Sequence, residues 1–182
     1  MTSYKTPVSF SLVTEWENAF LYEDDRTLRM LAALRDQLKL LRDTKSNPGI
    51  HPDAEFLASF HLPVPLIITI NDEWDVEAIR QQVLTAFGEE SDLIRLNLLP
   101  LKEQKYYAIK THAALSATTD LVVFIDCDVI PEDQWLLDLL ATMKDPRWGV
   151  AFGYTIVDHD SLYTKSFSLI KFQRPVETPK IE

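Results

Sequence analysis

The sequence is poor in the residues from which several common kinds of site are built. Its 182 residues include a single cysteine, Cys127, which excludes a disulfide framework and a zinc site made of several thiolates. Only four glycines are present, and none of them forms a dinucleotide-binding fingerprint or a phosphate-binding P-loop. The metalloprotease pair His-Glu-x-x-His and the hydrolase motif Gly-x-Ser-x-Gly are missing as well. Any chemistry of this chain therefore depends on other residue types.

Positive charge and long apolar runs are also scarce. The chain has 18 Lys and Arg against 28 Asp and Glu, a formal net charge of -10, which argues against general affinity for nucleic acid or an anionic membrane. No apolar stretch approaches the length of a transmembrane helix, and the polar residues 1–6 lack the core of a signal peptide. We therefore expect a cytoplasmic protein, and one that repels phosphate groups unless a metal ion or local basic residues intervene.

The composition is that of a folded protein. Hydrophobic residues make up 46% of the chain and aromatic residues 10%, enough to build a substantial core at this length. We expect one domain over residues 1–182.

The most informative stretch is an apolar run that ends in two acids. Residues 121–125, Leu-Val-Val-Phe-Ile, are typical of a central strand of a parallel sheet covered on both faces. Asp126 and Asp128 follow directly, and alternation along a strand predicts that they point to the same side. Open α/β sheets bind ligands at this carboxyl edge of their strands.

Two neighbouring carboxylates repel each other, which favours protonation, a basic partner or a cation. Hard oxygen ligands with room left for water favour Mg²⁺ or Mn²⁺, which usually complete their coordination with substrate phosphates. The sequence therefore predicts that Asp126 and Asp128 bind a metal ion. The alternative is that the two acids only cap the following turn or helix.

The rest of the chain alternates between predicted strands and helices. Strands are expected at 8–13, 66–70, 93–98, 121–125 and 148–153, and helices at 28–42, 76–87, 105–117 and 134–143. Residues 44–65 are predicted to form a long connection, with His51 and His61 as surface or loop residues rather than ligands. This alternation predicts a mostly parallel, Rossmann-like sheet flanked by helices.

Acids follow three of the predicted strands. Glu15, Asp72 and the pair Asp126 and Asp128 stand at carboxyl ends, which can line one crevice of the sheet. A single acid in such a place is more often a cap, but three strand ends together favour a ligand site.

Four segments resemble, in order and spacing, family-2 glycosyltransferases with the GT-A fold: residues 8–15, 68–72, 107–111 and 120–132. The resemblance covers residues 7–155. It implies a GT-A nucleotide-diphospho-sugar transferase fold and a nucleoside-diphosphate sugar, a UDP- or GDP-sugar, as donor. The sugar would pass to an acceptor hydroxyl with inversion, with Mn²⁺ or Mg²⁺ as cofactor.

The same resemblance implies roles for individual residues. Glu15 and Asp72 match positions that hold the nucleoside, with Thr14 beside them, and Lys110 matches a basic position next to the donor. Asp126 matches a residue near the ribose and the metal, and Asp128 matches the direct metal ligand.

The resemblance is incomplete where the catalytic base is expected. That base and the acceptor-binding half would follow residue 155, and Asp158, His159 and Asp160 are the only nearby candidates for the base. We therefore expect a GT-A domain that is incomplete at its C-terminus, with residues 156–182 leading toward a missing acceptor half and little sugar transfer by this chain alone. The apolar load of residues 162–172 predicts weak, concentration-dependent self-association.

Two other functions remain open. One is a non-catalytic nucleotide-sugar-binding module, which the missing base favours. The other is a phosphatase of the haloacid-dehalogenase type, in which the first Asp of an Asp-x-Asp motif is the nucleophile. That family places its motif near the start of the domain and follows it with Gly-Thr, whereas here Val129 and Ile130 follow.

Overall fold

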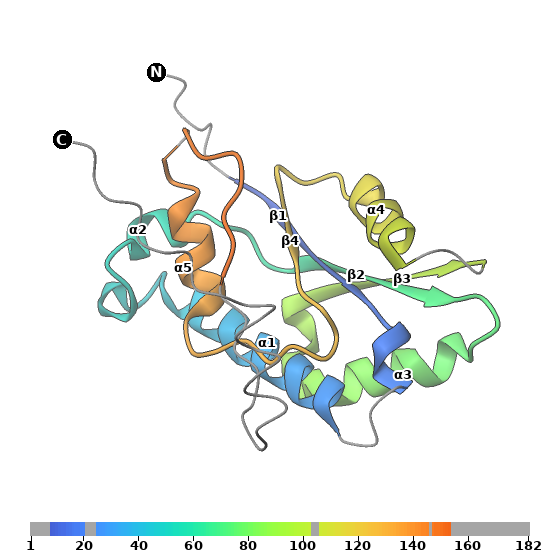
Figure 1. Ribbon diagram of the computed structural model, residues 1–182. Helices are drawn as coiled ribbons and strands as arrows, with labels where there is room; N and C mark the ends of the chain where they lie inside the picture. The colour runs from blue at the N-terminus through green and yellow to red at the C-terminus, as the bar shows by residue number, and fades with distance from the viewer. Residues whose placement is uncertain (1–7, 21–24, 103–105, 146, 154–182) are drawn as a thin grey trace, which may run out of the picture.

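The computed structural model describes residues 8–20, 25–102, 106–145 and 147–153. In this part of the chain, four parallel strands form one sheet in the order β3-β2-β1-β4 (Figure 1). The strands are β1 (Phe10–Glu15), β2 (Val64–Asn71), β3 (Ile94–Leu101) and β4 (Leu121–Phe124). The predicted parallel, Rossmann-like α/β sheet is confirmed at this level.

Helices cover both faces of the sheet. The helices are α1 (Arg26–Asp43), α2 (Ala54–Leu57), α3 (Val76–Phe87), α4 (Tyr106–Ser116) and α5 (Trp135–Thr142), with 3-10 turns at Glu17–Phe20, Pro48–Ile50 and Gly88–Leu93. In Figure 1, α1 and α3 lie together on one side of the strands and α4 lies on the other. None of the helices in the described ranges is long and apolar enough to cross a membrane.

The two faces of the sheet carry cores of very different size. The larger core joins alternate residues of the strands to the buried stripes of α1, α3 and α5. On the opposite face, Ala113 of α4 packs on Val13 and Ile67 in a smaller cluster. Since alternate strand residues share a face, Glu15 of β1 and Thr69 of β2 also lie on the α4 side.

Local signals define α3 most clearly. Asp75 Oδ1 accepts hydrogen bonds from the backbone amides of Glu77 and Ala78, both at 3.0 Å, and so caps the helix. Gly88 ends it with a φ of 56°, a left-handed conformation that glycine adopts without a Cβ clash. The predicted helix over 76–87 is confirmed at both ends.

Three local predictions need correction. Residues 148–153 are not a strand, although Trp148, Val150 and Phe152 alternate as a strand would; all three side chains are exposed. The connection 44–65 is not irregular throughout, because it contains the Pro48–Ile50 turn, α2 and the start of β2. The last helix begins at Trp135 rather than Gln134, which has a left-handed φ of 64°.

The order of the strands along the sheet reverses at one point. The chain moves from β1 outward to β2 and β3, and then crosses to the other side of β1 to form β4. This reversal puts the connecting helix α4 on the face opposite α1 and α3, as right-handed crossovers require (Figure 1). The carboxyl ends of β1 and β4 therefore flank the topological switch point, where doubly wound sheets bind ligands.

A buried glutamine of α1 secures the segment that follows the two acids. Gln37 is 3% exposed, and its Nε2 donates to the carbonyl oxygen of Glu132 at 2.6 Å. Its Oε1 accepts from the backbone amide of Leu136 at 2.5 Å. Because Gln134 provides no side-chain cap for α5, Gln37 supplies the missing acceptor from another helix.

We predict that Gln37→Leu lowers the free energy of unfolding by about 1–3 kcal/mol, because it leaves the buried amide of Leu136 and the carbonyl of Glu132 without their partner. Gln82→Leu, at an exposed position of α3, is the matched control and should change stability by no more than about 0.5 kcal/mol. Urea denaturation of the three proteins measures both effects. Equal losses in the two variants would contradict the role of Gln37.

Candidate functional site

The site is built around Glu15, the last residue of β1. Its side chain is fully buried although a carboxylate is costly to remove from water. The β1–β4 register pairs Val13 with Phe124, so Glu15 lies level with the Asp126–Asp128 turn. The backbone amide of Cys127 donates a hydrogen bond to the Glu15 carboxylate. Glu15 therefore fixes the turn between the two aspartates.

Asp126 and Asp128 lie in the turn that follows β4 rather than on the strand itself. The backbone amide of Val129 donates to the carbonyl oxygen of Asp126 at 3.1 Å and closes this turn. Asp126 and Asp128 are both half-buried, while Cys127 between them is buried in the larger core. The negative charge of Asp126 acts on the carboxyl group of Asp128.

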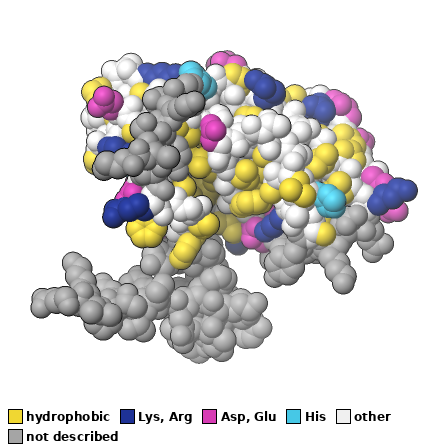
Figure 2. Space-filling model, turned by 90° about the horizontal axis from the view of Figure 1, so that it is seen from above, with side chains coloured by type: hydrophobic (Ala, Val, Ile, Leu, Met, Phe, Trp, Pro, Cys, Tyr) yellow, Lys and Arg dark blue, Asp and Glu magenta, His cyan; other side chains and the backbone are white. Residues whose placement is uncertain are grey.

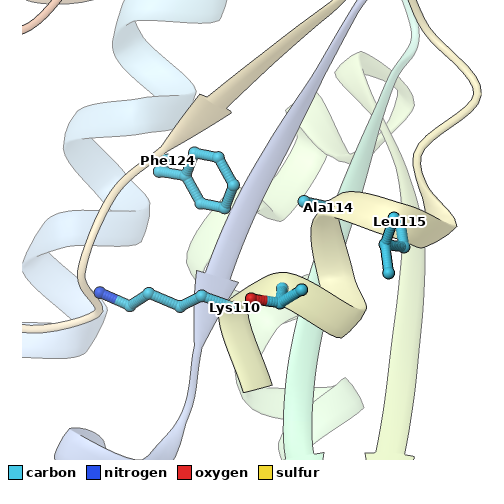
Figure 3. A pocket seen from close by; sticks show the side chains of 5 residues that line it. Lys110, Ala114, Leu115 and Phe124 are labelled. Atoms are coloured by element: carbon cyan, nitrogen blue, oxygen red, sulfur yellow. The ribbon is translucent and has the colours of Figure 1, made fainter. Parts of the chain in front are cut away.

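Lys110 of α4 reaches this turn from the face that Glu15 occupies. Its Nζ forms an ion pair with Oδ1 of Asp126 and lies 3.7 Å from Oε2 of Glu15. Figure 3 shows the side chain extended, with its amine carried away from Ala114 and Leu115. Because of these contacts with Asp126 and Glu15, Lys110 is not a freely solvated surface lysine.

Burial and charge perturb two of the carboxyl groups. Burial raises the pKa of Glu15 from 4.5 to about 7; Lys110 opposes the rise and Asp126 adds to it. Burial also raises the pKa of Asp128, and the negative charge of Asp126 contributes in the same direction. The site thus has three carboxyl groups, those of Glu15, Asp126 and Asp128, beside the single ammonium group of Lys110. Such an excess of acidic groups favours the binding of an added cation.

Sequence reasoning missed a second basic residue of the site. Arg26 is the first residue of α1, and its positive charge stabilises the ionised form of Asp128. A cation at a helix N-terminus opposes the helix dipole, so an arginine in this position indicates an acidic partner elsewhere. That signal was available in the sequence.

The remaining predicted site residues lie further from this cluster. Asp72 is exposed in the turn after β2, at the same edge of the sheet but beyond β1. Thr14 is buried on the opposite face of β1 from Glu15, and its Oγ1 donates to the carbonyl oxygen of Glu15 at 3.3 Å. Asp158 and Asp160 lie outside the described residues.

The two histidines of residues 44–65 differ. His61 is exposed, as predicted, but His51 is a buried loop residue. Its Nδ1 accepts from the backbone amide of Asp53 at 3.0 Å, so its Nε2 carries the proton donated to Asp138 Oδ1 at 3.0 Å. His51 therefore joins this loop to α5 and has a structural role.

An open hollow of about 440 Å³ lies beside the acidic turn. Its lining is mainly apolar and comprises Lys110, Thr111, Ala114, Leu115 and Phe124. Leu115 and Phe124 are 79% and 46% exposed, and Figure 2 shows hydrophobic side chains gathered on the surface of the molecule. The polar cluster and this hollow meet at Lys110.

The donor set at the switch point consists of carboxylates. Within the described ranges, no three His, Cys, Asp or Glu side chains are placed to hold a metal ion together. The ion pair between Lys110 and Asp126 shows that Asp126 already binds one positively charged group. Asp126 and Asp128 supply two hard oxygen ligands. Such a pair fits Mg²⁺ or Mn²⁺ when substrate phosphates and water provide the other ligands.

Comparisons of the chain with protein-family models, with curated proteins and with solved structures found no match. The assignment to family-2 glycosyltransferases therefore remains a prediction from the motifs.

The burial of Glu15 predicts how stability depends on pH. Between pH 4.5 and about 7 the folded protein keeps the Glu15 proton that the unfolded chain releases, so stability falls as pH rises through this window. Relative to wild type, Glu15→Gln should gain on the order of 3 kcal/mol of unfolding free energy between pH 4 and pH 8.

Chemical denaturation at several pH values measures this difference. Glu89→Gln, which removes an exposed glutamate, is the matched control. Parallel pH profiles for wild type and Glu15→Gln would contradict the predicted shift.

Proposed function

We propose that this chain binds a nucleoside-diphosphate sugar through a divalent cation and is the donor-binding part of a glycosyltransferase of the family-2, GT-A type. The proposed reaction transfers the sugar to an acceptor hydroxyl with inversion. The observation that carries the proposal is the convergence of Glu15, Lys110, Asp126 and Asp128 at the switch point of a parallel sheet.

The position of the cluster supports a nucleotide ligand. In open α/β sheets, ligands occupy the crevice outside the carboxyl ends of the strands where the strand order reverses. Here the strand order reverses between β1 and β4, and the carboxyl ends of these two strands carry the only acids in the described residues whose pKa is raised by burial. A ligand bound at this point would lie directly against the acidic turn.

The charge of the cluster supports a metal ion as the link to phosphate. A diphosphate alone would be repelled by Asp126, Asp128 and the net charge of -10. A divalent cation held by Asp128 and Asp126 would neutralise their two negative charges, and it would still have coordination positions for phosphate oxygens. When bound, it would stabilise the charge that develops on the departing diphosphate.

The basic residues support the same ligand. Lys110 approaches from the α4 face and Arg26 from the start of α1, so the acidic turn has a cation on each side. In this arrangement Lys110 and Arg26 offset phosphate charge that the metal does not neutralise. In this proposal Asp72, which is exposed at the same edge of the sheet, contacts the nucleoside end of an extended donor.

We predict that UDP or GDP binds only when Mn²⁺ or Mg²⁺ is present, because the metal provides the attraction that the acidic turn lacks. Calorimetric titration with each nucleotide in Mn²⁺, in Mg²⁺ and in excess chelator tests this. Equal affinity in chelator would overturn the metal-bridged mode of binding.

We predict that Asp128→Asn weakens metal-dependent nucleotide binding by about a hundredfold or more, since it removes a charged ligand and leaves a neutral amide. The matched control is Asp133→Asn, an exposed acid five positions further along the chain, which should bind as wild type does. A similar loss in both variants would point to a general effect of net charge.

Activity assays separate the proposed enzyme from its alternatives. Release of UDP or GDP from donor sugars supports a transferase site, and binding without release supports a binding module. Hydrolysis of simple phosphate esters that depends on Asp126 would instead indicate a phosphatase.

A further inference from the structure

Lys110 faces two carboxylates at once. Its Nζ is paired with Oδ1 of Asp126 and lies 3.7 Å from Oε2 of Glu15. The Lys110 side chain is 23% exposed, that of Asp126 is 40% exposed, and that of Glu15 is fully buried. One ammonium group therefore balances a partly solvated carboxylate and a buried one.

The backbone of Lys110 is fixed by packing of α4 on the sheet, whereas its side-chain ammonium can pair with either of two carboxylates. The neighbouring Ile109 is buried, and Ala113 packs against Val13 and Ile67 of the sheet, so α4 is anchored on both sides of Lys110. In Figure 3 the four methylene groups of Lys110 extend along the sheet toward the turn after β4. Rotation about these bonds is enough to exchange Asp126 for Glu15 as the nearer partner.

Asp126 is also one of the two proposed metal ligands, so its two cationic partners compete. An ammonium and a divalent cation on one carboxylate would repel each other strongly in this half-buried site. Lys110, however, has a second carboxylate, that of Glu15, within reach at 3.7 Å. Moving the ammonium to Glu15 places its charge beside the carboxylate that is furthest from water.

We propose that the ammonium of Lys110 is an exchangeable counter-ion: it neutralises Asp126 in the metal-free protein and moves to Glu15 when a divalent cation binds. Lys110 thus competes with the metal for Asp126, and Glu15 lowers the cost of metal binding by receiving the displaced ammonium. This inference rests on the metal site of the proposed function.

Calorimetric titration of Mn²⁺ alone, without nucleotide, tests the exchange. Lys110→Met removes the competitor and should tighten Mn²⁺ binding about tenfold or more. Glu15→Gln removes the acceptor of the displaced amine and should weaken Mn²⁺ binding about tenfold. In the double variant the Glu15→Gln change should have little further effect, because no ammonium remains to be displaced.

A matched control variant and a second measurement, thermal unfolding, test the same exchange. Lys144→Met breaks an ion pair with Asp53 on another part of the surface and should leave Mn²⁺ affinity unchanged. Thermal unfolding in chelator should occur at a lower temperature for Lys110→Met than for wild type, and Mn²⁺ should raise it more in the variant. If Lys110→Met does not fold, the comparison of Glu15→Gln with wild type still tests the exchange.

The outcomes separate this inference from the proposed function. Mn²⁺ affinity that is unchanged or weaker in Lys110→Met, or unchanged in Glu15→Gln, overturns the exchange, as does a lack of Mn²⁺ binding in every variant. Metal-dependent UDP binding by wild type would still support the proposed function in the first two cases. Conversely, the expected Mn²⁺ affinities without any UDP or GDP binding would support the exchange and overturn the proposed function.

Discussion

The arrangement of the site depends on one buried carboxylate. Glu15 ends the central strand β1 out of contact with solvent, and it accepts a hydrogen bond from the amide of Cys127 while Lys110 lies nearby. These interactions offset part of the cost of burying the charge, and they also connect β1, α4 and the turn after β4. A carboxylate in this position serves the geometry of Asp126 and Asp128 at a cost in stability.

Other polar contacts hold the same elements from a distance. At the start of β4, Asp120 accepts hydrogen bonds from the amide and hydroxyl of Ser9, which align β4 with β1. Beyond the acidic turn, Gln37 of α1 binds the backbone on both sides of residues 133–135. The Asp126–Asp128 turn therefore lies between two fixed points of the chain. Hydrogen bonds between Ser9 and Asp120 fix the chain before it, and those of Gln37 fix the chain after it.

The predictable parts of the fold are those with local signals. Asp75 and Gly88 mark the two ends of α3, and the leucines of α1 repeat at helical spacing, so both helices could be located from the sequence. Residues 148–153 show the limit of such signals: Trp148 and its neighbours alternate like a strand, yet pairing with the sheet depends on distant residues. The role of Gln37 was equally invisible, because its partners, the carbonyl of Glu132 and the amide of Leu136, lie 95 and 99 residues away in the chain.

The sequence alone determined that an apolar strand presents Asp126 and Asp128 at its carboxyl end, and that acids follow other strands of a parallel α/β sheet. This information is local, because strand periodicity and charge can be read from neighbouring residues. Only the tertiary structure decided that Glu15 rather than Asp72 lies against this turn, and that Lys110 is shared by Glu15 and Asp126. The order β3-β2-β1-β4 makes β1 the neighbour of β4, and burial and contact between distant segments follow from that order.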